Sequence, residues 1–212
     1  MTKLIWILLL LLCTTSSLYS QYKSFTTIEN PTSLLTSIKD KTSIIERFSC
    51  EVEMTYSHKF NTNNHTEKAS LFFLKSNSFA WKYSYPNTYT ITILNNEAST
   101  NENGFTEEYI LGQNIDFKLT NKLLLAYYNS SLLGLKEYKD SHYENELTYL
   151  IRLFPLNNSI SNIYNNIELI INKIDFGLVG IRFNKVDNSI VNYIFNDRII
   201  NGIIDEGVFE ME

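Results

Sequence analysis

The residues from Lys68 to Tyr85, KASLFFLKSNSFAWKYSY, constrain the fold more than any other stretch of the chain. They predict two strands joined by a short Ser-Asn-Ser turn, and Pro86 follows the second strand. On that second strand a two-residue alternation places four aromatic side chains on one face: Phe79, Trp81, Tyr83 and Tyr85. Such a row either packs beneath a helix or lines an apolar concavity, and the alternation alone does not separate these readings.

The composition favours strands over helices. The chain has 212 residues, of which 14% are aromatic, and only seven are Gly and three Pro. Ile, Thr, Tyr and Phe are typical of strands, and the abundant Asn can supply turns where Gly usually would. The formal net charge of -5 excludes a basic surface for nucleic acid. All-β domains often reach this length as one unit, so we expect a single domain over residues 21–212.

The first 20 residues have the pattern of a cleavable export signal. Lys3 supplies the positive start, the run from Leu4 to Cys13 is apolar, and the small residue Ser20 precedes a cut before Gln21. The apolar run is too short to span a membrane. Leu12 stands where lipoprotein processing at Cys13 requires a small residue, so we expect export to the periplasm without lipidation.

Removal of that segment leaves Cys50 as the last cysteine, so the sequence predicts no intrachain disulfide. A small buried apolar residue is a better interpretation of Cys50 than a reactive thiol. The exported protein would then depend on its apolar core for stability.

An amphipathic helix is expected after Pro31, capped by Thr32 or Ser33, because apolar residues follow at helical spacing: Leu34, Ile38, Ile45 and Phe48. It can be an ordinary helix covering a sheet or a movable cover. A second helix is expected over Leu119–Leu135.

Strands account for most of the remaining pattern. Cys50–Phe60 alternates cleanly between an apolar and a polar face, Asn61–His65 is predicted to be a turn, and Asn95–Asn103 is polar and weakly patterned. Further strands are expected at residues 68–75, 79–85, 89–94, 105–111, 147–154, 167–172, 178–183 and 190–195. These elements predict one large curved antiparallel sheet interrupted by two helical pieces.

Signals for catalysis are weak. His58, His65 and His142 are scattered, without the spacing of a metal site or a catalytic triad. The chain has neither a Gly-rich phosphate loop nor a nucleophile elbow, and the acidic pairs Glu107-Glu108 and Glu144/Glu146 are best read as solvated loops. We therefore expect no enzyme, no cofactor and no metal.

Several of these segments resemble the outer-membrane lipoprotein carrier family, the LolA-like periplasmic chaperones. The likeness lies in Leu74-Lys75, the Ser-Asn-Ser turn, Phe79-Ala80-Trp81 and Pro86. Toward the C-terminal end it continues in Ile167–Ile171, Ile181-Arg182-Phe183, Tyr193-Ile194-Phe195, Asn201 and Phe209. It spans nearly all of residues 21–212, although each motif is loose.

The resemblance implies an unclosed, or half, β-barrel whose concave face is covered by helices. It implies that this face binds the acyl chains of lipoproteins, without cofactor or covalent chemistry. It also implies two membrane partners, an inner-membrane exporter and an outer-membrane acceptor, and we expect a monomer.

Two departures from the family pattern bear on the site. Members commonly have Arg-Pro where this chain has Lys75-Ser76, and that Arg holds the lid closed by hydrogen bonds. Lys75 keeps the charge but lacks the planar fork of donors, so we expect a weaker lid latch or a partner contact there. Asn95–Ala98 replaces an Asp-Gly and aromatic pattern, which leaves the pocket shape around residues 95–111 open.

With the aromatic face assigned to the concave side by this resemblance, specific side chains become candidates. The predicted lipid-binding wall is Val52, Met54, Tyr56, Phe79, Trp81, Tyr83 and Ile91, with Tyr hydroxyls near the rim. The predicted lid contacts are Leu34, Leu35 and Ile38 from the first helix and Leu123 and Leu124 from the second.

Three other functions remain open. The same half-barrel serves in envelope sensors of lipids or lipoproteins, which usually add a second domain. It could also carry another amphiphile, such as a glycolipid. A secreted enzyme on a β scaffold is the third alternative, and the missing catalytic cluster argues against it.

Overall fold

The computed structural model describes residues 25–58, 61–95, 97–132 and 135–210, and the side chains of 61–63 lie outside the description. The predicted export signal at 1–20 also falls outside the described residues. None of the described helices is long and apolar enough to cross a membrane.

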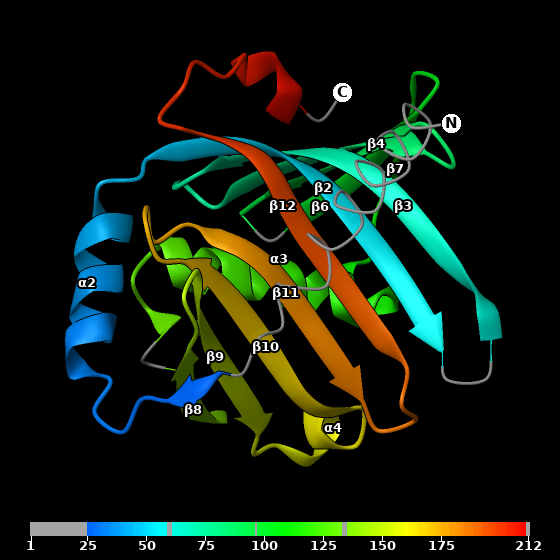
Figure 1. Cartoon of the computed structure of the whole chain (residues 1–212). Coiled ribbons are helices and arrows are strands. Elements are labelled where there is room, and N and C mark those ends of the chain that lie inside the picture. Colours follow the sequence, from blue (N-terminus) through cyan, green and yellow to red (C-terminus); the bar gives the residue numbers. More distant parts are fainter. Residues whose placement is uncertain (1–24, 59–60, 96, 133–134, 211–212) are drawn as a thin grey trace, which may run out of the picture.

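One antiparallel sheet of twelve strands dominates the structure (Figure 1). The strands run from one edge to the other in the order β1-β8-β9-β10-β11-β12-β2-β3-β4-β5-β6-β7, so β1 and β7 are the edge strands. Their bounds are β1 Thr26–Thr27, β2 Arg47–His58, β3 Asn61–Leu74, β4 Ser78–Tyr85, β5 Tyr89–Leu94, β6 Glu97–Glu102, β7 Phe105–Glu108, β8 Tyr138–Glu144, β9 Thr148–Pro155, β10 Tyr164–Asn172, β11 Leu178–Lys185 and β12 Ile190–Ile200.

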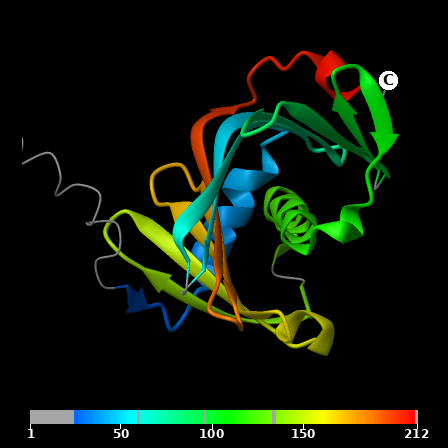
Figure 2. The ribbon, with the colours of Figure 1, turned by 90° about the vertical axis from the view of Figure 1, so that its right-hand side faces the viewer.

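The sheet curls without closing, so it is the expected unclosed half-barrel. In Figure 2 it curves around α3 (Ile115–Tyr128), which lies along the concave face, while α2 (Thr32–Ser43) lies beside it. A short helical turn, η2 (Leu111–Gln113), lies between β7 and α3, and another, α4 (Asn158–Ser161), connects β9 and β10. The turn η4 (Glu206–Phe209) lies on the outer face.

Asparagine forms many of the tight turns, as the composition indicated. Asn77, Asn103 and Asn188 adopt φ of 66°, 55° and 64° in the connections β3–β4, β6–β7 and β11–β12. Asn tolerates this left-handed conformation better than other residues with a side chain, because its short polar group can hydrogen-bond locally. The chain thus makes sharp reversals with few glycines.

The first helix is shorter than its apolar spacing predicted. It ends at Ser43, Ile45 lies beyond it, and Phe48 belongs to β2. Ile45 and Phe48 fit the helical spacing by coincidence, because one is buried in the turn after the helix and the other faces inward from β2. The cap predicted at Thr32 or Ser33 is wrong, because both residues lie inside the helix and its N-cap is Pro31. The Thr32 amide donates to Asn30 Oδ1 instead.

The turn predicted at Asn61–His65 is wrong, because these residues begin β3 and pair with β2. A polar strand end looks like a loop when no apolar face marks it. The same reason explains β6 within the weakly patterned residues 95–103, and β8, which was not predicted. The second helix starts four residues before its predicted start at Leu119 and ends at Tyr128.

Tyr85 also differs from its prediction. A register shift between Lys68 and Ala69 against β4 breaks the alternation, and the Tyr85 side chain is exposed to solvent. Phe79, Trp81 and Tyr83 remain on the buried face. The inward row of β4 therefore contains three aromatic residues instead of four.

Candidate functional site

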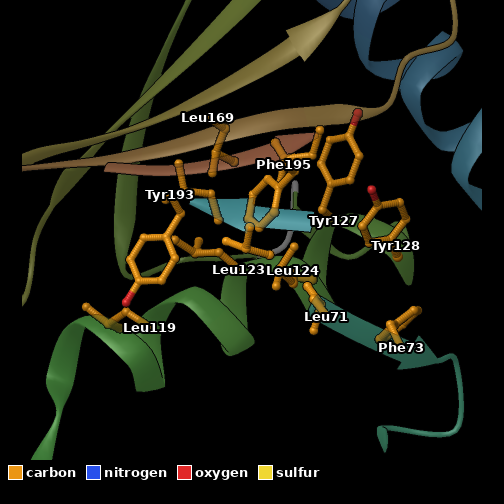
Figure 3. Close-up of a cluster of buried hydrophobic side chains, with 14 of the residues drawn as sticks. Leu71, Phe73, Leu119, Leu123, Leu124, Tyr127, Tyr128, Leu169, Tyr193 and Phe195 are labelled. Carbon is orange, nitrogen blue, oxygen red and sulfur yellow. The ribbon is translucent and has the colours of Figure 1, made fainter. Parts of the chain in front are cut away.

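The concave face of the sheet is apolar, and α3 lies against it. Figure 3 shows α3 side chains meeting residues of β3, β10 and β12. Leu123 and Leu124 are almost completely buried there, as are Leu71 of β3 and Tyr193 of β12. The helix follows Asn114, whose side chain caps it by accepting from the Phe117 amide.

The predicted wall and lid come together in this core. Six of the seven predicted wall residues are buried, namely Val52, Met54, Phe79, Trp81, Tyr83 and Ile91, and Tyr56 is partly buried against them. Among the predicted lid residues, Leu34, Ile38, Leu123 and Leu124 are buried and Leu35 packs against the same cluster. Whether these residues bind a lipid remains a prediction.

In this state the wall is covered. Trp81 has no exposed surface and packs edge-on against Phe117 of α3, with ring centroids 5.3 Å apart. Its indole N–H donates to Asn121 Oδ1 of α3 at 2.9 Å. A ligand can reach this part of the wall only after α3 has moved.

A buried carboxylate anchors the start of α3 to the opposite part of the sheet. Tyr164 of β10 donates its hydroxyl to Asp116 Oδ1 at 2.5 Å, and Lys185 of β11 donates to Oδ2 at 2.7 Å. Burial raises the pKa of the Tyr164 hydroxyl well above its usual value, and its bond to Asp116 raises it further. The hydroxyl therefore stays protonated and serves as a donor.

Lys75 contacts the first helix. Its Nζ donates to the carbonyl oxygen of Ser43, the last residue of α2, at 2.7 Å and lies 3.5 Å from Glu46 Oε1. A cation at a helix C-terminus is favourable, because the last carbonyls there lack partners within the helix. The position suits the predicted latch, but Lys75 bonds α2 and not α3.

Sequence reasoning missed much of the interior surface. Phe183 of β11 and Tyr193 and Phe195 of β12 are buried with the predicted wall, as are Leu71 and Phe73 of β3. Their alternation in the sequence could have identified them, since Ala69, Leu71 and Phe73 are two residues apart. The strand pairing needed to place β12 beside β2 has no local signal in the sequence.

The remaining titratable candidates have ordinary structural surroundings. Burial raises the pKa of the Cys50 thiol, so it stays protonated as a small apolar residue. His142 is buried in β8 with its Nε2 3.6 Å from Asp140, and His65 lies in β3 rather than in a turn. Within the described residues, no three His, Cys, Asp or Glu side chains are grouped to hold a metal ion.

A separate cavity of ≈ 220 Å³ lies on the other face of the sheet, between β4–β7 and the C-terminal segment. It is lined mostly by hydroxyl and amide groups: Thr90, Thr92, Ser99, Asn101 and Thr106, with Lys82, Gly207, Val208 and Glu210. An acyl chain gains little from such a lining, so this cavity is a poor candidate for a lipid site.

No family model matches the chain, and no curated protein does. Among solved structures, a conserved protein of Thermus thermophilus is similar with a TM-score of 0.51 and 7% identity, over 85% of this chain and 94% of that one. A LolA superfamily protein of Nitrosomonas europaea has a TM-score of 0.44 and 10% identity, with coverage of 83% and 97%. LprF of Mycobacterium bovis has 0.45 and 13%, with coverage of 85% and 97%.

At these identities the likeness concerns the fold alone. The open antiparallel sheet and the helix on its concave face agree with the half-barrel expected from the sequence. The chain therefore has the open, helix-covered half-barrel that its sequence resemblance to the LolA-like carriers implied.

Proposed function

We propose that the chain is a periplasmic carrier that binds the acyl chains of lipoproteins between α3 and the concave face of the sheet. It would receive them from an inner-membrane exporter, deliver them to an outer-membrane acceptor, act as a monomer and perform no enzymatic step. The observation that carries this proposal is the position of α3, a helix that is itself apolar, across the apolar face of a sheet that does not close.

The free energy gained by burying an acyl chain is similar in size to that gained by burying the apolar side chains of α3. An acyl chain of about 16 carbons gains roughly 13 kcal/mol when it leaves water, at about 0.8 kcal/mol per CH₂. Six large α3 side chains are buried and contribute about 9–18 kcal/mol at about 1.5–3 kcal/mol each: Phe117, Leu119, Leu123, Leu124, Tyr127 and Tyr128. A chain can therefore displace the helix, and the helix can cover the wall again after release.

This similarity is what a carrier requires. A permanently open apolar face would promote aggregation, and a face that bound cargo much more strongly than its own helix would not release it. The arrangement with α3 over the wall corresponds to the closed form of such a carrier. The polar contacts of Trp81 with Asn121 and of Asp116 with Tyr164 and Lys185 hold α3 in this position.

The test uses one lipoprotein in two forms, with and without its acyl chains. Purified protein lacking residues 1–20 is mixed with each form, and soluble complexes are measured by size-exclusion chromatography. We expect a complex with the acylated form alone. Substitution of the wall residue Ile91→Thr should weaken it several-fold, whereas Ile194→Thr, an exposed position on the outer face of β12, should not.

A complex that forms equally well without the acyl chains would contradict the proposal. Mass spectrometry of ligands that co-purify from the bacterial envelope identifies the cargo directly. Recovery of a glycolipid in place of lipoprotein acyl chains would support the second cargo class on the same wall.

An envelope sensor that binds a protein partner is the alternative function. A corner of exposed isoleucines at the ends of α2 and β12 favours it: Ile44, Ile199 and Ile203. Asn201 joins the two segments, since its side chain donates to the Ile44 carbonyl oxygen and accepts from the Glu46 amide. Loss of a specific protein complex on Ile44→Ser and Ile203→Ser, with acyl binding unchanged, would favour sensing over transport.

A further inference from the structure

Glu67 is an inward-facing carboxylate at the end of the apolar wall. Along β3 the residues Ala69, Leu71 and Phe73 face the interior without exposed surface, and Glu67 is the next position in this row. It pairs directly with Met54 of β2, which is also fully buried. Its side chain is 23% exposed, so the carboxylate lies where the interior meets solvent.

Four tyrosines surround this end of the wall, and we call Tyr56, Tyr83, Tyr89 and Tyr109 the tyrosine rim. Tyr56 donates its hydroxyl to Glu67 Oε2 at 3.4 Å. The rings of Tyr83 and Tyr89 stack with centroids 4.4 Å apart. Tyr109, just before α3, packs edge-on against Phe117 of that helix. The tyrosine rim therefore contains residues of the sheet and a residue of the segment that precedes α3.

The negative charge of Glu67 affects the pKa of the hydroxyl groups in the tyrosine rim. Burial first, and the Glu67 carboxylate second, raise the pKa of Tyr89 to about 12, and the same two causes raise the pKa of Tyr109. Tyr56 is affected in the same direction. All three hydroxyls stay neutral at physiological pH, so the rim combines aromatic rings with the carboxylate of Glu67.

Among the described residues, no Lys or Arg forms an ion pair with Glu67. Its partner there is His65, whose Nε2 lies 3.1 Å from Glu67 Oε1 and whose side chain is 57% exposed. Asp116, by contrast, is directly bound by Lys185. The ordinary interpretation of Glu67 is a solvated carboxylate near a strand end. That interpretation does not explain why four tyrosines gather beside it on the interior side of the sheet.

We propose that Glu67 and the tyrosine rim bind the ammonium group of an amphiphile whose acyl chain lies against the concave face. A carboxylate attracts the cation, and aromatic faces add cation–π attraction when the group is partly desolvated. An anionic head would be repelled by Glu67. This inference rests on the proposed function and adds to it a preference for amphiphiles with a positively charged head.

The test compares three probes with the same 12-carbon chain, each kept below its critical micelle concentration. Dodecylammonium carries a cation, dodecyl maltoside is neutral, and dodecanoate is an anion. Isothermal titration with the protein lacking residues 1–20 should give an affinity for dodecylammonium about tenfold above that for the neutral probe, and weakest binding of dodecanoate.

Glu67→Gln should remove this preference and leave binding of dodecyl maltoside unchanged. Glu53→Gln is the matched control, because it makes the same charge change in neighbouring β2, between the inward-facing Val52 and Met54 and hence on the outer face. It should keep the preference.

The outcomes separate the two proposals. Equal affinities for the three probes in the unmodified protein, a preference that survives Glu67→Gln, or an equal loss in Glu53→Gln would each overturn the ammonium site while leaving acyl binding intact. Failure of all three probes to bind would count against the carrier itself.

Discussion

Trp81 and Asn121 form a hydrogen bond between the sheet and the helix inside it, with the indole nitrogen 2.9 Å from the amide oxygen and both side chains buried. Asn121 also donates to the Phe117 carbonyl oxygen in its own helix, so its amide is oriented from both sides. The bond from Trp81 to Asn121 is one of the polar contacts between α3 and the sheet, beside those of Asp116 with Tyr164 and Lys185. It defines one angular position of α3 against the wall.

Asn121→Ala should reduce the free energy of unfolding by about 1–3 kcal/mol, because the Trp81 N–H is left buried without an acceptor. If cargo enters by displacing α3, the same change should strengthen acyl binding, since it weakens the closed state that competes with cargo. Urea unfolding and titration with an acyl probe measure the two effects.

The control for that experiment is Asn184→Ala, which removes an amide hydrogen bond to Asn166 between β11 and β10. It should lower stability without strengthening acyl binding. Stronger binding in both variants would mean that general destabilisation, and not the release of α3, is responsible.

The buried ion pair at the start of α3 should be energetically coupled. In a double-mutant cycle of Asp116→Asn and Lys185→Met, we expect a coupling energy of about 1–3 kcal/mol, because the two groups are in direct contact and largely desolvated. Denaturant unfolding of the four proteins gives this value. Additive effects of the two substitutions would show that solvent already screens the pair.

Lys75→Met should loosen the end of α2. The loss of the bond from Nζ to the Ser43 carbonyl oxygen removes about 0.5–1 kcal/mol of local stability. Hydrogen exchange should accelerate for amides in the last turn of α2 while those of α3 remain unchanged. Equal acceleration in both helices would make Lys75 a latch for the whole cover, and no change in either would exclude it as a latch.

Stability should fall in mild acid because of His142. Burial lowers the pKa of this histidine below its usual 6.5, and Asp140 offsets the effect only in part. Below pH 6.5 the unfolded chain therefore binds a proton that the folded chain does not, so the free energy of unfolding decreases as pH falls through the folded-state pKa. His142→Gln should make the unfolding free energy less dependent on pH between 7 and 5, and an unchanged dependence would assign the acid sensitivity to other groups.

Local patterns identified the strands with a clear apolar face. Tyr89–Leu94 matches β5 at both ends, and Val52, Met54 and Trp81 are inward-facing as the resemblance implied. Polar strands such as β6 and β8 could not be recognised, because their stability comes from neighbours in the sheet and not from their own side chains.

The sequence allowed the residues of the apolar wall to be predicted, but not the position of α3 against that wall. Alternation placed Phe79 and Trp81 on one face, yet neither residue signals how closely α3 packs on them. The hydrogen bond from Trp81 to Asn121 joins residues 40 positions apart. Such contacts depend on the strand order β12-β2-β3-β4 and on the helix position, which short-range sequence patterns do not encode.

The most direct test of the carrier is quenching of Trp81 by a brominated acyl chain. The chain has two tryptophans, so removal of residues 1–20, which contain Trp6, leaves Trp81 as the only one. If cargo lies between α3 and the wall, a brominated chain should strongly quench Trp81 fluorescence while the same chain without bromine does not. Saturable binding of the brominated chain with unchanged Trp81 fluorescence would place the lipid elsewhere and contradict the account.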